Sequence, residues 1–197
     1  MMRPRRSFAS ALLLLAACGI TARGLACGYH GGLGDGFTAQ HPLSIDVAMA
    51  VRRALDDGVL ASSKVLPPFL AFGRANRVLA DVRGALAADF EQSKVGVEFA
   101  LLLVEASLWS RFHIDAGQPV LDIHVTGPLP DDDIVITAEP VLQALLDGRY
   151  SIDQAIRDRL IVVAPSSAGS GAVIIDAVRR AFHNAVPRKA SYRTAPG

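Results

Sequence analysis

The chain has 197 residues and a formal charge of +1, because 20 Lys and Arg side chains nearly balance 19 Asp and Glu side chains. A nearly neutral chain has no strong field to attract nucleic acid or an anionic membrane surface, so neither is an expected partner. Hydrophobic residues make up 51% and aromatic residues 6% of the chain, and this aliphatic composition gives enough apolar volume for the core of one domain.

Residues 1–26 have the composition of a secretion signal. A basic stretch is followed by an apolar run over residues 8–17 and then by small residues, which is the order that export machinery reads. The run is shorter than the about 20 apolar residues that a transmembrane helix needs, so it predicts export and no transmembrane span. We therefore expect an exported, periplasmic protein.

Two cleavage sites remain open in this signal. Leu-Ala-Ala-Cys at residues 15–18 has the form of a lipobox, in which Cys18 would be acylated and would anchor the protein to a membrane. Cleavage after Ala26 is the alternative, because small residues precede Cys27 at the positions that ordinary signal peptidase reads. The pair Arg5 and Arg6 also leaves open whether export uses the general or the twin-arginine route.

A glycine-rich leader without periodicity follows at residues 27–40. Its Cys27 and His30 are candidate ligands for copper or zinc, with His41 as a possible third. One Cys and one His are half of a tetrahedral site, and no partner pair with metal spacing occurs elsewhere. A plain leader beside a cleavage site is therefore the favoured interpretation.

One domain is expected over residues 41–186, and it begins with two amphipathic helices. The first starts near Pro42 and stops at Asp57-Gly58, and the second starts at Pro68. In both, apolar residues recur at intervals of three and four, which places them on one face of a helix.

The period changes to that of strands after Asp89. Four strands are expected, over residues 95–104, 108–115, 121–125 and 134–137. Their short connections predict a four-stranded antiparallel meander with one face on a core.

Helices return after the fourth strand. Thr137 is a candidate cap for a short helix that ends at Asp147-Gly148. Ser151 and Gln154 have the spacing of a capping box, which predicts a second short helix. A fifth strand over residues 160–164, a C-terminal helix over 173–182 and a disordered tail over 187–197 complete the chain. This segregation of strands and helices is typical of the α+β class.

The stretch from Ile134 to Val163 resembles the sterol carrier protein type 2 family. It shows a strand, a capped helix that ends in Leu146-Asp147-Gly148, a second short helix and a closing strand, and the wider resemblance covers roughly residues 95–163. The resemblance implies a five-stranded sheet whose apolar face, covered by helices, encloses a tunnel for acyl chains or other apolar ligands. It supplies no catalytic residues.

Polar groups on the predicted strands do not require catalysis. His113, His124 and Glu98 fit the solvated face of half-buried strands, and no serine lies in a nucleophile elbow. Gly169 and Gly171 lack the Lys-Ser/Thr ending of a nucleotide loop. We expect a non-enzymatic protein without a cofactor.

The expected ligand site is an apolar seam between the third strand and the first short helix. Its residues are Leu121, Ile123, Val125, Leu142, Leu145 and Leu146. Close packing favours a solid seam, whereas the resemblance implies a hollow one. The sequence thus predicts an exported module that binds a lipid or another hydrophobic ligand. Two alternatives remain, namely a protein-binding or assembly accessory with a solid core, and a periplasmic metal-binding protein that uses Cys27 and His30.

Overall fold

The computed structural model describes residues 41–62, 66–115 and 119–190, and in them the α+β class is confirmed. In chain order the elements are α2 (Ser44–Asp56), α3 (Pro68–Ser93), β1 (Val97–Leu103), β2 (Leu108–Ile114), β3 (Val120–Ile123), β4 (Ile134–Thr137), α4 (Glu139–Leu146), α5 (Ile152–Arg157), β5 (Val162–Ala164) and α6 (Ser170–Ala190). The order of helices and strands is the one that the sequence predicts.

The five strands form one mixed sheet in the order β3-β2-β1-β4-β5. The pairs β1–β2, β2–β3 and β4–β5 are antiparallel, whereas β1 and β4 are parallel. The predicted antiparallel meander is therefore correct for the first three strands and wrong for the fourth.

The burial of β1 explains this topology. Residues 99–103 of β1 are at most 2% exposed, and a stretch of strand that is buried on both faces is most stable with a neighbour on each edge. The connection of residues 124–133 carries the chain from β3 to the free edge of β1. There the N–H of Ala100 donates to the carbonyl of Asp133 at 2.8 Å, and that of Val104 donates to Thr137 at 2.9 Å.

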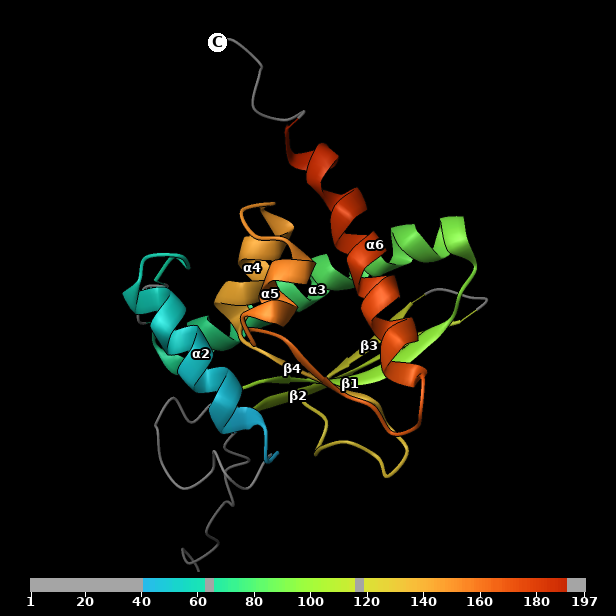
Figure 1. The fold of residues 1–197 in the computed structure, drawn as a ribbon, viewed down its shortest axis with the longest axis horizontal. Helices are drawn as coiled ribbons and strands as arrows, with labels where there is room; N and C mark the ends of the chain where they lie inside the picture. The colour runs from blue at the N-terminus through green and yellow to red at the C-terminus, as the bar shows by residue number, and fades with distance from the viewer. Residues whose placement is uncertain (1–40, 63–65, 116–118, 191–197) are drawn as a thin grey trace, which may run out of the picture.

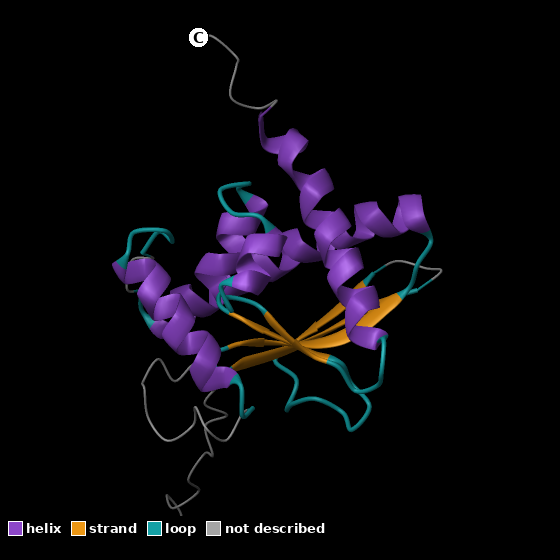
Figure 2. Cartoon of the chain, in the orientation of Figure 1, coloured by secondary structure: helices purple, strands orange, loops and turns teal. Residues whose placement is uncertain are grey.

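The helices lie together on one side of the sheet, and the β3–β4 connection passes on the other side (Figures 1 and 2). The strand register places Phe99 and Phe112 side by side on one face, and their buried rings stack with centroids 5.0 Å apart. The opposite face carries the exposed pair Glu98 and His113. On the helical side, α3 packs against β2, β3, α4 and α6, and α6 also packs against β1 and β5.

The helix ends confirm one expected cap and correct another. Ser151 and Gln154 form the predicted capping box of α5, with bonds of 3.2 Å in both directions. Thr137 does not cap α4. Its hydroxyl donates to the carbonyl of Leu160 at 3.0 Å instead, because Thr137 is fully buried at the end of β4, beside the segment that enters β5.

Several expectations concern the ends of the chain. Residues 1–40, which hold the predicted signal and the leader, lie outside the described residues. Helix α6 runs to Ala190, past position 187 at which the sequence predicted the start of a disordered tail. Within the described ranges, no helix combines the length and the apolar character that a membrane crossing requires.

Candidate functional site

A half-open pocket of about 410 Å³ lies between α2, α3, the β1–β2 turn and the start of α4. Its volume falls within the range of about 300–1,000 Å³ that is typical of small-molecule sites. Most of its wall is aliphatic. The apolar lining residues are Ala48, Met49, Val51, Leu55, Val104, Ala138 and Pro140.

Helix α2 supplies one wall because its sequence is amphipathic. Val47 faces the core and is 0% exposed, whereas Val51 and Met49 line the pocket and are 7% and 51% exposed. The entrance also carries Arg52, which pairs with Asp56 one turn later at 2.9 Å in an exposed ion pair. Arg52 therefore contributes a solvated positive charge at the rim and not in the interior.

Three ionisable side chains converge on the inner wall, namely Arg74 of α3, Glu105 of the β1–β2 turn and Glu139 of α4. Arg74 forms an ion pair with Glu139, whose side chain is 5% exposed. Glu105 accepts the backbone N–H of Glu139 through Oε1 at 2.5 Å. The second oxygen of Glu105, Oε2, is buried and has no hydrogen-bond partner among the described residues.

Burial governs the protonation of both carboxyl groups. It raises the pKa of Glu105 to about 7, although the N–H bonds that the carboxyl accepts oppose the shift. The pKa of Glu139 is also raised by burial, against the attraction of Arg74. The pocket thus combines an aliphatic wall with a carboxyl group that changes charge near neutral pH, and perturbed groups of this kind in a pocket mark candidate functional sites.

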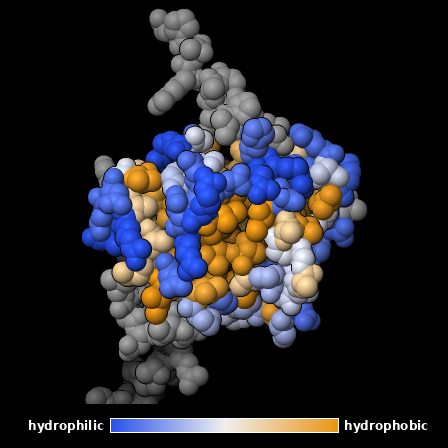
Figure 3. Space-filling model, viewed as in Figure 1, coloured by the Kyte–Doolittle hydropathy of each residue, from blue (hydrophilic) through white to orange (hydrophobic). Residues whose placement is uncertain are grey.

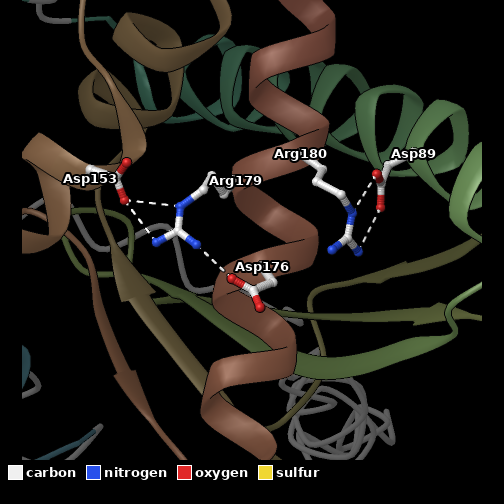
Figure 4. Close-up of polar contacts among 5 residues, drawn as sticks. All are labelled: Asp89, Asp153, Asp176, Arg179 and Arg180. Carbon is white, nitrogen blue, oxygen red and sulfur yellow. Dashed lines mark hydrogen bonds and ion pairs between the residues drawn. The ribbon is translucent and has the colours of Figure 1, made fainter.

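A second half-open pocket, of about 640 Å³, lies between α6 and the segment from α4 to α5. Its charged side chains are already paired, as Figure 4 shows from the two sides of α6. Arg179 binds Asp153 of α5 at 2.8 Å, and Arg180 binds the buried Asp89 of α3 at 2.9 Å. These pairs hold α6 against its neighbours, so we assign them a structural role and take the smaller pocket as the candidate site.

The molecular face in Figure 3 shows an apolar area at its centre, flanked by polar side chains. Strand β5 lies at the edge of the sheet, next to α6. Its three apolar residues are only half-buried, so they leave part of their apolar surface exposed. Contiguous apolar areas on a protein surface often mark contact sites for a partner, whereas apolar residues that are scattered singly do not.

The six residues of the predicted seam belong to one hydrophobic core. Leu142, Leu145 and Leu146 of α4 are 1–5% exposed, and the residues of the β3 region are partly buried against the same cluster, namely Leu121, Ile123 and Val125. Both α4 and β3 pack against α3, which links the two halves of the seam. Leu145 lines the 640 Å³ pocket, and none of the six lines the 410 Å³ pocket.

The remaining candidate residues are placed as follows. Cys27 and His30 lie outside the described residues, and within the described ranges no three His, Cys, Asp or Glu side chains are grouped to hold a metal. His41 accepts the N–H of Leu43 through Nδ1 at 3.2 Å, and burial lowers its pKa. His41 therefore lies just before α2 and accepts a backbone hydrogen bond there.

His113 and His124 each contact one neighbouring side chain. His113 pairs with Glu98 at 3.2 Å on the exposed face of the sheet. His124 packs edge to face against the ring of Phe72, with centroids 6.3 Å apart. Neither histidine lines one of the two pockets.

Sequence reasoning missed Arg74, Glu105 and Glu139. They lie 31 and 34 residues apart in the chain, and only the tertiary structure brings them together. One signal was present, because Glu105 directly follows the uninterrupted apolar run of residues 99–104. A carboxylate at the end of a buried strand is expensive unless it has a partner, which marks it as a residue to explain.

Comparisons with known proteins assign no family to this chain. No family model matches the chain, and no curated protein is similar to it. A solved structure of a stereoselective inverting sec-alkylsulfatase from Pseudomonas sp. aligns with a TM-score of 0.35 and 9% identity, over 49% of this chain and 14% of that one. A double mutant of that sec-alkylsulfatase aligns with a TM-score of 0.35 and 11% identity, over 43% and 13%. This chain thus spans a small part of the enzymes that it matches, and the sulfatase activity is a property of those enzymes.

Proposed function

We propose that this protein is a non-enzymatic module that binds a hydrophobic ligand, and that the ligand occupies the 410 Å³ pocket between α2, α3 and α4. The observation that carries the proposal is the wall of that pocket, where seven apolar residues surround three converging ionisable side chains. Small-molecule sites in proteins typically combine a predominantly apolar lining with a few polar groups that orient the ligand.

The place of the pocket differs from that of the predicted seam, but the ligand class is the same. Arg74 and Glu139 neutralise each other at the inner wall, so a ligand there meets little net charge apart from Glu105. Aliphatic side chains then supply the binding energy, at about 25 cal/mol for each Å² of apolar surface removed from water.

We also propose that the protein acts outside the cytoplasm, because residues 1–26 have the composition of a secretion signal. Membership of the sterol carrier protein type 2 family is a further part of the proposal, and it rests on the sequence resemblance alone. The intact mass of the exported protein tests the proposed export. We expect a chain that begins at Cys27 or at an acylated Cys18, and an exported chain that still begins at Met1 would contradict it.

Titration with Nile red, a neutral apolar dye, tests the binding function. We expect saturable binding at one site per molecule of purified protein. Ala48→Phe places a bulky ring in the pocket and is expected to weaken binding about tenfold or more, which corresponds to about 1.4 kcal/mol. Ala80→Phe, at an exposed position of α3 outside the pocket, is the matched control and is expected to leave the affinity unchanged.

Two outcomes would contradict the proposal. Equal affinity in Ala48→Phe and Ala80→Phe would place the dye elsewhere. If the wild-type protein binds no apolar probe, the protein-binding alternative takes precedence. A specific observation favours it as the second candidate, because α2 and the start of α3 present exposed apolar side chains, among them Met49 at 51% and Phe69 at 72%.

A further inference from the structure

Glu105 lines the 410 Å³ pocket, and within the described part of the chain the fold leaves one oxygen of its carboxyl group without a hydrogen-bond partner. Glu105 uses Oε1 to accept the N–H of Glu139 at 2.5 Å, while its Oε2 is buried without a partner among the described residues. A buried oxygen of this kind keeps the full penalty of its desolvation until a donor reaches it. Glu105 also lines the pocket, so a ligand in the pocket is the available source of that donor.

The charges around Glu105 limit what the donor can be. Glu139 and Arg74 both act on the Glu105 carboxyl group through space. A carboxylate head group on the ligand would be repelled by Glu105 and Glu139, while Arg74 is already engaged by Glu139. An ammonium head group would be attracted by Glu105, but it would lose its hydration in a pocket whose wall is mostly aliphatic, and a single ion pair does not repay that cost.

A neutral hydroxyl group meets neither objection. It donates a hydrogen bond to Oε2 when Glu105 is ionised, and it accepts one when Glu105 is protonated. Resting on the function proposed above, we propose that the ligand of this pocket is an apolar molecule with an alcohol group, and that the alcohol binds the free oxygen of Glu105 while the aliphatic part lies against α2.

Displacement of Nile red by three decyl compounds tests the head group. At pH 8.5, where Glu105 is ionised, we expect 1-decanol to displace the dye at about tenfold or more lower concentration than methyl decyl ether, because the ether accepts hydrogen bonds but donates none. Decanoate is expected to be the weakest competitor. Equal affinity of the alcohol and the ether, or tighter binding of decanoate than of decanol, would overturn the inference.

Glu105→Gln provides the decisive variant because it keeps the size of the side chain. Its amide oxygen can still accept the N–H of Glu139, while its NH2 group replaces the free oxygen by a donor. We expect the alcohol and the ether to bind this variant within about twofold of each other. Glu98→Gln, at an exposed carboxylate of β1 with 53% side-chain exposure, is the control and is expected to keep the preference for the alcohol.

The outcomes separate this inference from the proposed function. If the wild-type protein binds Nile red but does not distinguish the alcohol from the ether, the proposed binding of an apolar ligand is supported and the proposed role of Glu105 is contradicted. If Nile red does not bind, direct calorimetric titration with 1-decanol decides. No saturable heat would remove both proposals. Saturable heat with an affinity that Glu105→Gln lowers would retain the alcohol site, and an affinity that Glu105→Gln leaves unchanged would remove it.

Discussion

Glu105 accepts the backbone N–H of Glu139 at 2.5 Å, so a carboxyl group from the β1–β2 turn caps the first turn of α4. Helix α4 has no side-chain cap of its own, and a helix N-terminus stabilises a carboxylate that reaches it. The bond joins one end of the sheet to the helical layer, and the burial that it requires sets the protonation of Glu105.

The stability of the protein should therefore depend on pH through Glu105. Its pKa is raised from 4.5 to about 7 in the folded state, so the folded protein binds more protons than the unfolded chain between these values. The free energy of unfolding should fall as pH rises through this window, by at most about 3 kcal/mol. Urea unfolding at pH 4.5–8 measures this decrease in the free energy of unfolding. The part of the decrease that comes from Glu105 should be absent in Glu105→Gln. Equal pH profiles for wild type and Glu105→Gln would contradict the assignment, and Glu98→Gln should follow the wild type.

Loss of Arg74 should destabilise the fold. Glu139 is 4% exposed, so Arg74→Leu leaves a buried carboxylate without its ion-pair partner, which typically costs about 3–5 kcal/mol. We expect a loss of stability at the lower end of this range, because the Arg74 side chain is 29% exposed and water partly screens the ion pair. Arg77→Leu, at an exposed position on the same helix, should change stability by less than about 0.5 kcal/mol. Similar melting temperatures for the two variants would show that the pair contributes little.

Leu145→Ala should show whether the residues of the predicted seam stabilise the core or bind the ligand. Leu145 is 1% exposed on α4, so truncation should lower the free energy of unfolding by about 2–5 kcal/mol through lost transfer energy and the cavity left behind. The affinity for Nile red should not change, because Leu145 does not line the 410 Å³ pocket. The reverse result, a small loss of stability with altered dye binding, would return the ligand to the seam. Leu129→Ala, at a position that is 56% exposed, is the control.

Asp133 should anchor the loop before α6. Its Oδ1 accepts the N–H and the hydroxyl of Ser166 and the hydroxyl of Ser170, at 2.5–2.9 Å. Partial burial opposes ionisation, but these hydrogen bonds prevail and the pKa of Asp133 is lowered. Asp133→Ala should cost about 1–3 kcal/mol at neutral pH and speed amide hydrogen exchange at residues 166–170.

The contribution of Asp133 should disappear in acid. A carboxyl group with a lowered folded pKa stabilises the fold above its unfolded pKa of 3.8, and this contribution is lost as pH falls through the folded pKa. The difference in stability between the wild type and Asp133→Ala should therefore shrink in acid. Asp131→Ala, at an exposed position of the same connection, should show no such difference at any pH. A difference between wild type and Asp133→Ala that persists below the folded pKa would indicate packing and not charge.

The sequence by itself determined the local elements of this protein, because their causes are local. Intervals of three and four in the apolar residues predicted α2 and α3, alternation predicted β2 and β3, and the spacing of Ser151 and Gln154 predicted the cap of α5. Each pattern acts within a few residues of the chain. The structure bears out the α+β class and the order of the elements on this basis.

The tertiary structure alone decided the sheet topology and the candidate site, because both depend on residues far apart in the chain. Whether β4 pairs with β3 or with β1 depends on which edge must be covered, and the burial of β1 settles it in favour of a parallel pair. Thr137 illustrates the same point, since a hydroxyl with the local pattern of a helix cap bonds to Leu160 instead. Arg74, Glu105 and Glu139 carry no common motif, and they form a cluster only because α3, the β1–β2 turn and α4 pack around one pocket.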